Sequence, residues 1–248
     1  MAFLQTAVYS HSLQLQVAFN AVLPETGGDD IPVLYLLHGL SDDHTIWHRR
    51  TSIERYAEAR GLAVIMPAGN RSFYTDMVTG PRYWTYISEE LPAICRKLFR
   101  ISHKRDRTFA AGLSMGGYGA FKLGLRTPGN FAAVASLSGG VDMAAAVKRF
   151  REQGNPLAPE FDRMFGDPLR PEDDLPALAR AAAASGGDLP KLWMCCGSND
   201  FLIDFNRSFD KHLTTLGLEH VYIETPGRGH EWGYWDEMIV KALDWLPL

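Results

Sequence analysis

The residue that most clearly predicts chemistry is Ser114, which lies in the segment Gly112-Leu113-Ser114-Met115-Gly116. The pattern G-x-S-x-G is typical of a serine nucleophile on a sharp turn between a strand and a helix. Small neighbours let the two elements approach without a Cβ clash. The turn lifts the hydroxyl above the sheet edge and places the helix N-terminus where a developing oxyanion is stabilised. We therefore predict that Ser114 is a catalytic nucleophile.

A general base and an orienting acid follow Ser114 in the chain. His230 is the one histidine of eight that stands in a loop after the last strand-like segment, and glycines precede it. Asp200 follows the turn Gly197-Ser198-Asn199 after the seventh such segment, whereas Asp204 is expected to fall inside the next helix. We therefore predict a Ser-His-Asp triad with Asp200 rather than Asp204 as its acid.

An oxyanion hole needs two backbone N–H donors beside the nucleophile. One should come from Met115, the residue after Ser114, and the other from the loop after the third strand. That strand ends in Leu37-His38-Gly39-Leu40, so Leu40 is the second predicted donor. His38 is expected to brace the loop by a hydrogen bond rather than to take part in catalysis.

These residues would be positioned by alternating strands and helices. The first two strand-like segments alternate apolar and polar residues, as half-buried antiparallel strands do. The later ones are mostly continuous apolar runs, typical of parallel strands covered on both faces. Strands are expected at about 4–10, 13–22, 32–37, 62–66, 108–111, 132–137, 192–196 and 221–223, and helices at about 50–60, 87–99, 115–126, 201–216 and 235–245. This order predicts an α/β fold with a mostly parallel eight-stranded sheet and helices on both faces.

The segment from about 141 to 190 interrupts this rhythm. It is rich in proline, glycine and alanine and is too long for an ordinary connection after the sixth strand. We interpret it as an insertion within a single domain spanning 1–248. It is either a small cap beside the site or a surface excursion without substrate contact.

Composition excludes several other classes of protein. The net charge of −4 and the pI of about 6.1 give no basic surface for nucleic acid. No apolar run is long enough to span a membrane, and we identify no leader peptide. The odd number of cysteines (Cys95, Cys195 and Cys196) fits buried thiols in a reducing, cytoplasmic compartment, with neither a disulfide framework nor a metal site. An exposed sheet edge or the insertion could support a homo-oligomer.

Four segments give the chain a family resemblance over nearly its whole length. They are 33–40, 112–119, 196–201 and Gly229-His230-Glu231-Trp232. With these the sequence resembles the esterase D-like, or tributyrin-esterase-type, carboxylesterases. The resemblance implies an α/β-hydrolase fold and hydrolysis of short acyl esters without a metal or organic cofactor. Related enzymes include S-formylglutathione hydrolases, feruloyl and acetylxylan esterases, and mycolyltransferases.

Aromatic residues near the predicted catalytic loops indicate a narrow apolar acyl pocket. They are Trp47, Tyr74, Trp84, Phe201 and Trp232. Such a pocket would favour acetyl to butyryl groups over long lipids. Four alternatives to this small-molecule esterase stay open: a thioesterase of the S-formylglutathione hydrolase kind, a carbohydrate acetyl or feruloyl esterase, an acyltransferase, and a non-catalytic binding module.

Overall fold

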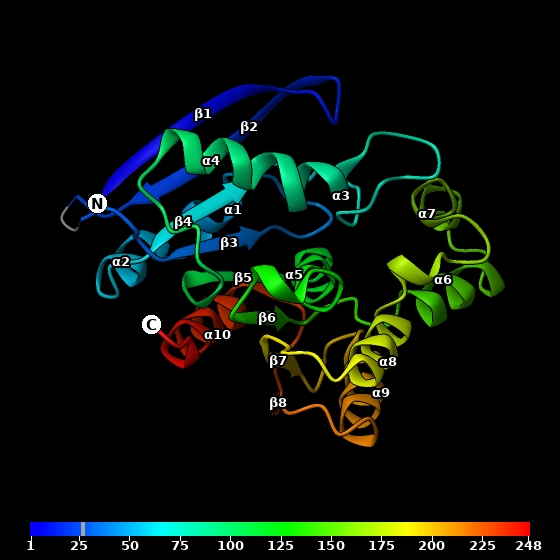
Figure 1. Ribbon diagram of the computed structural model, residues 1–248. Coiled ribbons are helices and arrows are strands. Elements are labelled where there is room, and N and C mark those ends of the chain that lie inside the picture. Colours follow the sequence, from blue (N-terminus) through cyan, green and yellow to red (C-terminus); the bar gives the residue numbers. More distant parts are fainter. Residues whose placement is uncertain (26–27) are drawn as a thin grey trace.

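The structure is a computed structural model that describes residues 1–25 and 28–248. Its strands form one eight-stranded sheet in the order β1-β2-β4-β3-β5-β6-β7-β8 (Figure 1). They are β1 (Ala2–Ser10), β2 (Leu15–Leu23), β3 (Val33–Leu37), β4 (Ala63–Pro67), β5 (Thr108–Leu113), β6 (Ala133–Leu137), β7 (Lys191–Gly197) and β8 (His220–Thr225). The mostly parallel eight-stranded sheet predicted from the sequence is confirmed.

The direction of each strand follows its residue pattern. The strands β3 to β8 pair in parallel, whereas β2 pairs antiparallel with both β1 and β4. In β3, Val33 and Tyr35 enter one apolar core, and Leu34 and Leu36 enter the other, because successive side chains point to opposite faces. A central parallel strand therefore needs apolar residues at every position.

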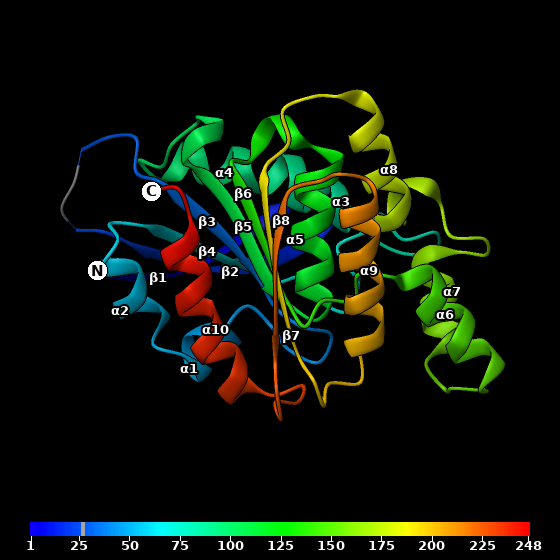
Figure 2. The same ribbon diagram turned by 90° about the horizontal axis from the view of Figure 1, so that it is seen from below.

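Helices cover both faces of this sheet (Figure 2). One face carries α1 (Ile46–Arg50), α2 (Ile53–Glu58) and α10 (Trp232–Trp245), and the other carries α4 (Leu91–Leu98), α5 (Met115–Arg126), α8 (Leu175–Ser185) and α9 (Ile203–Thr215). The single helix predicted at 50–60 is instead the pair α1 and α2. Thr51 separates them, since its backbone is extended and its hydroxyl accepts a hydrogen bond from the Ile53 amide. The helix predicted at 87–99 begins earlier, with α3 (Tyr83–Thr85) and the π-helical turn η1 (Tyr86–Glu90) preceding α4.

The predicted insertion after the sixth strand folds into helices. They are α6 (Met143–Glu152), α7 (Ala158–Phe165), the short 3₁₀ turn η4 (Pro171–Asp173) and α8. The helix α8 packs against α5, whereas α6 and α7 project to one side, next to the loop that joins β4 to α3 (Figure 1). The insertion is thus attached to the helix that follows Ser114.

The three cysteines are buried free thiols, as predicted. Within residues 1–25 and 28–248, the structure has no helix long and apolar enough to cross a membrane. Over the same residues, no three His, Cys, Asp or Glu side chains are grouped so that they could hold a metal ion.

Candidate active site

Ser114 occupies a strained turn between β5 and α5. Its backbone angles, φ 52° and ψ −115°, are rarely adopted by a residue with a side chain. A Cβ on Gly112 would lie 2.4 Å from the Gly116 backbone, and one on Gly116 would lie 2.3 Å from the Leu37 carbonyl oxygen. The two glycines of the motif are therefore required for strand and helix to meet at Ser114.

The turn that follows β6 also holds Ser114 in place. The Ser114 amide donates to the Leu137 carbonyl (2.8 Å), and the Gly140 amide donates to the Ser114 carbonyl (3.1 Å). Both hydrogen bonds fix the backbone rather than the side chain. The strained conformation is therefore supported from the neighbouring strand end.

Asp200 and His230 form a hydrogen-bonded pair. Asp200 lies just after β7 and is 2% exposed; its Oδ2 is 2.8 Å from His230 Nδ1, and its Oδ1 accepts from the Leu202 amide at 2.9 Å. Burial alone would raise the pKa of Asp200, but the hydrogen bond and charge of His230 outweigh it and keep that pKa below its usual value. An ionised Asp200 accepts the proton of Nδ1–H, so Nε2 of a neutral His230 is free to accept a proton.

Asp204 lies away from this pair, in the first turn of α9. Its side chain is 79% exposed and its carboxylate is 3.7 Å from the guanidinium of Arg207. The structure thus brings Asp200, and not Asp204, to His230.

The His230 ring contacts two aromatic rings, and the sequence did not indicate one of them. The ring of Trp235 meets it edge to face at 4.8 Å, and Phe201, 64% exposed, lies tilted against it at 4.5 Å. The Trp235 indole N–H donates to the Ser138 hydroxyl at 3.1 Å, in the turn after β6. That bond places His230 and Ser114 against the same turn. Trp235 falls on the buried face of α10, so its sequence position resembles ordinary core.

His38 braces the loop after β3, as the sequence predicts. Its Nδ1 donates to the Gly39 carbonyl (2.7 Å), and its Nε2 accepts from the Gly69 amide (2.8 Å). Burial lowers the pKa of His38 to about 4, so the ring is neutral and this tautomer persists at neutral pH. The Asp42 amide donates to the same carbonyl at 3.2 Å.

These contacts orient the peptide that joins Gly39 to Leu40. In a trans peptide the N–H points opposite to the C=O. Since the Gly39 carbonyl faces His38, the Leu40 N–H faces the other way. A Cβ on Gly39 would lie 3.8 Å from the Ser114 Cβ, so this peptide lies beside Ser114.

Three of the five aromatic residues predicted to line the pocket are instead part of the supporting core. Trp47 is 1% exposed and donates to the Leu37 carbonyl at 2.9 Å; the buried Tyr74 donates to the His38 carbonyl at 3.0 Å. Trp84 is buried against the Lys122 ammonium, 4.9 Å from its ring centre. Their positions near the predicted catalytic loops in the sequence could not show whether these side chains face the substrate or pack in the core. Phe201 lies against His230, whereas Trp232 is half-buried between Trp47 and Trp235.

A charge cluster ties the insertion to α5: Lys122 and Asp173 are buried at its centre, and Arg170 is half-buried at its edge. Asp173 Oδ1 accepts from Lys122 Nζ (2.5 Å) and Thr75 Oγ1 (2.5 Å), and its Oδ2 accepts from Arg170 Nε (2.8 Å). Burial lowers the pKa of Lys122 and would raise that of Asp173, but Lys122 outweighs it and keeps the Asp173 pKa below its usual value. Three separate chain segments therefore depend on one carboxylate.

This cluster predicts an asymmetric loss of stability. Asp173→Asn leaves the fully buried Lys122 ammonium without its counter-charge, whereas Arg170 keeps Glu172 at 3.9 Å, and should lower the free energy of unfolding by about 3–5 kcal/mol. Lys122→Met should cost less, because Asp173 keeps Arg170 and Thr75. Urea unfolding followed by circular dichroism measures both, with Asp188→Asn, an exposed partner of Arg105, as control. An equal or larger loss in Lys122→Met would show that the carboxylate is not the centre of the cluster.

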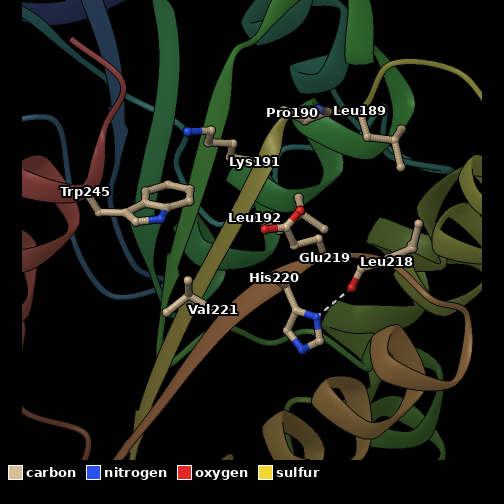
Figure 3. A pocket seen from close by; sticks show the side chains of 9 residues that line it. All are labelled: Leu189, Pro190, Lys191, Leu192, Leu218, Glu219, His220, Val221 and Trp245. Carbon is tan, nitrogen blue, oxygen red and sulfur yellow. Dashed lines mark hydrogen bonds between the residues drawn. The ribbon is translucent and has the colours of Figure 1, made fainter.

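An open hollow of about 270 Å³ lies at the other end of the sheet (Figure 3). It is lined by the residues that begin β7 and β8, with Trp245 on one side and Leu189 and Leu218 on the other. Asp200 follows the carboxyl end of β7, so this hollow is separate from the pair of Asp200 and His230.

Comparison with known proteins agrees with this arrangement. The model of the family described as "Putative esterase" matches residues 10–246, and the chain belongs to this esterase family. The acetyl esterase of Caldicellulosiruptor saccharolyticus is 31% identical over 262 residues, which cover 99% of this chain and 98% of that protein.

Two solved structures from Staphylococcus aureus are similar over the whole chain. One is the fluorophosphonate-binding serine hydrolase F with bound substrate, at 32% identity and a TM-score of 0.88. The other is an S-formylglutathione hydrolase, at 32% identity and a TM-score of 0.86. Each alignment covers 99% of this chain and 98% of the other. The fold is that of the α/β-hydrolases, and the esterase D-like resemblance of the sequence is confirmed.

Proposed function

We propose that this protein is a serine carboxylesterase that hydrolyses short-chain acyl esters, from acetyl to butyryl, with Ser114, His230 and Asp200 as its triad. The observation that carries the proposal is the 2.8 Å pair of Asp200 and His230 beside the strained turn of Ser114. The similarity to an acetyl esterase supports the choice of substrate. The buried free cysteines support a cytoplasmic location.

In this proposal each residue has one step. His230 Nε2 takes the proton of Ser114 as Oγ attacks the acyl carbon, and the backbone N–H groups of Leu40 and Met115 stabilise the oxyanion. The tetrahedral intermediate collapses to an acyl-serine while His230 returns the proton to the leaving alkoxide, which departs as the alcohol. Water, activated by His230, then releases the acid and restores Ser114.

A thioesterase that acts on S-formylglutathione is the second candidate, supported by the similarity to the S-formylglutathione hydrolase. The same acyl-enzyme chemistry serves both substrates, since only the leaving group differs. Carbohydrate acetyl or feruloyl ester hydrolysis is a third candidate, and a ferulic acid esterase of 24% identity has the same fold.

A substrate panel tests the proposal. Purified protein would be assayed with p-nitrophenyl esters from acetate to laurate, with acetylated sugars, and with S-formylglutathione and S-acetylglutathione. We expect the highest kcat/KM on short oxygen esters. A strong preference for glutathione thioesters would favour the second candidate. Without turnover of any substrate, a non-catalytic binding role would replace the proposal.

Replacing His38 tests the oxyanion loop. His38→Phe removes both ring hydrogen bonds and leaves the Gly39 carbonyl with the Asp42 amide, so the Gly39–Leu40 peptide is held less firmly and kcat should fall by up to about 10²–10³-fold, the loss typical of one oxyanion donor. Steady-state kinetics with p-nitrophenyl acetate measure this loss, and circular dichroism checks the fold. The exposed His103, replaced by Phe, is the control. Full activity in folded His38→Phe would mean that Leu40 needs no bracing or is not a donor.

A further inference from the structure

The proposed function fixes which side of Ser114 each half of an ester must occupy. His230 has to reach the leaving oxygen to protonate it, so the alcohol lies on the side of His230 and the exposed Phe201. The acyl chain extends from the same carbonyl carbon in another direction, away from His230. The residues on that side therefore set the acyl length.

Phe73 lies close to two residues that adjoin Ser114. Its amide donates to Met115 Sδ at 3.3 Å, next to Ser114 in the chain, and its ring is 3.4 Å from where a Cβ on Gly140 would lie. The Gly140 amide in turn contacts the Ser114 carbonyl. Phe73 thus contacts the residues that flank the nucleophile on two sides.

Three aromatic rings from the insertion and from α5 pack against the Phe73 ring. The rings of Phe161 and Phe165 in α7 each lie 5.5 Å from the Phe73 ring, and that of Tyr118 in α5 lies 5.6 Å from it. All four rings are buried. Together they form a closely packed apolar layer next to Met115.

The backbone at Phe73 is held in an unfavourable conformation. Phe73 and Tyr74 both have positive φ, 49° and 50°, which is an outlier for bulky residues and is found most often at functional sites. The surroundings enforce it, because the Tyr74 carbonyl faces Lys122 Nζ at 3.4 Å and Thr75 is bound by Asp173. Nearby, Arg71 forms a two-fold ion pair with Glu160 of α7 at 2.6 Å per bond.

We propose that Phe73 is the specificity-determining residue that limits the acyl chain, and that the insertion acts as the fixed wall behind it. This inference rests on the proposed esterase activity. It names the loop between β4 and α3, together with α7, as the closed end of the acyl pocket. The charge cluster of Lys122, Asp173 and Arg170 and the Arg71–Glu160 ion pair fix the positions of this loop and of α7.

Shortening Phe73 should extend the pocket. Phe73→Ala removes the ring while keeping the restricted backbone, and it opens space between Met115 and α7. The ratio of kcat/KM for p-nitrophenyl octanoate to that for acetate should rise about 10- to 100-fold, as expected when a hydrophobic pocket accepts additional methylenes. Phe73→Leu should give a smaller rise, and it provides the test if Phe73→Ala does not fold.

Phe209→Ala is the matched control. Phe209 is equally buried, in α9, and packs on Phe121 rather than near Ser114, so its loss should weaken the core without changing the ratio. An unchanged ratio in both folded Phe73 variants would overturn the inference. So would an equal rise in Phe209→Ala, because general loosening would then explain it. If wild-type protein hydrolyses no ester of any length, the proposed function fails first.

Discussion

Ser114→Ala is expected to lower kcat by about 10⁶-fold, the loss typical of removing a nucleophile that works together with its base. The residual rate should come from the oxyanion donors and from substrate binding alone. The fold should persist, because Ser114 is held by its backbone amide and carbonyl, both of which alanine retains. Alanine also keeps the restriction on φ, so the turn between β5 and α5 is not loosened.

Stopped-flow kinetics with p-nitrophenyl acetate in excess would test the role of Ser114, since a burst of product equal to the enzyme concentration reports acyl-enzyme formation. The burst should vanish in Ser114→Ala and persist in Ser185→Ala, since Ser185 ends α8 and lies outside the turn between β5 and α5. A burst that survives in Ser114→Ala would place the nucleophile elsewhere. Unfolding by urea would show whether any loss is one of chemistry or of structure.

The strands and helices could be predicted from the sequence, because the pattern of apolar and polar residues that defines each of them lies within a short segment. In β3 the run Val33–Leu37 is apolar at every position, and only a strand covered on both faces buries all of it. The glycines around Ser114 predict the sharp turn between β5 and α5 for an equally local reason. A Cβ at Gly112 or Gly116 would clash with backbone atoms. The break between α1 and α2 escaped prediction because it depends on the hydroxyl of one threonine.

The surroundings of the site could be predicted less well, because they depend on contacts between distant segments. Lys122 lies in α5 and Asp173 lies in the insertion. Nothing in the sequence around either residue indicates that the two form an ion pair. Trp47 and Tyr74 were expected to face substrate, but their polar atoms bond to carbonyls of the β3 end and hold the oxyanion loop from behind. Phe73 has no sequence signal, since its positive φ is imposed by neighbours from other elements.

Asp200→Asn is expected to lower kcat by about 10⁴-fold, as in other serine triads. The amide would still accept from Leu202, but its NH₂ group would face His230 Nδ1 in place of a carboxylate oxygen. Nδ1 would then become an acceptor and the proton would move to Nε2. With Nε2 protonated, His230 cannot take the proton of Ser114. The loss should therefore appear in kcat, with the KM for p-nitrophenyl acetate little changed.

Asp204→Asn is the matched control, because it makes the same substitution four residues away. Asp204 is exposed and contacts only Arg207 among the ion pairs of the described residues, so its variant should keep wild-type kcat. A large loss in Asp204→Asn with a small one in Asp200→Asn would reverse the assignment of the acid. The expected contrast follows from burial, because Asp200 is a buried carboxylate hydrogen-bonded to His230 Nδ1, whereas Asp204 is exposed and does not contact His230.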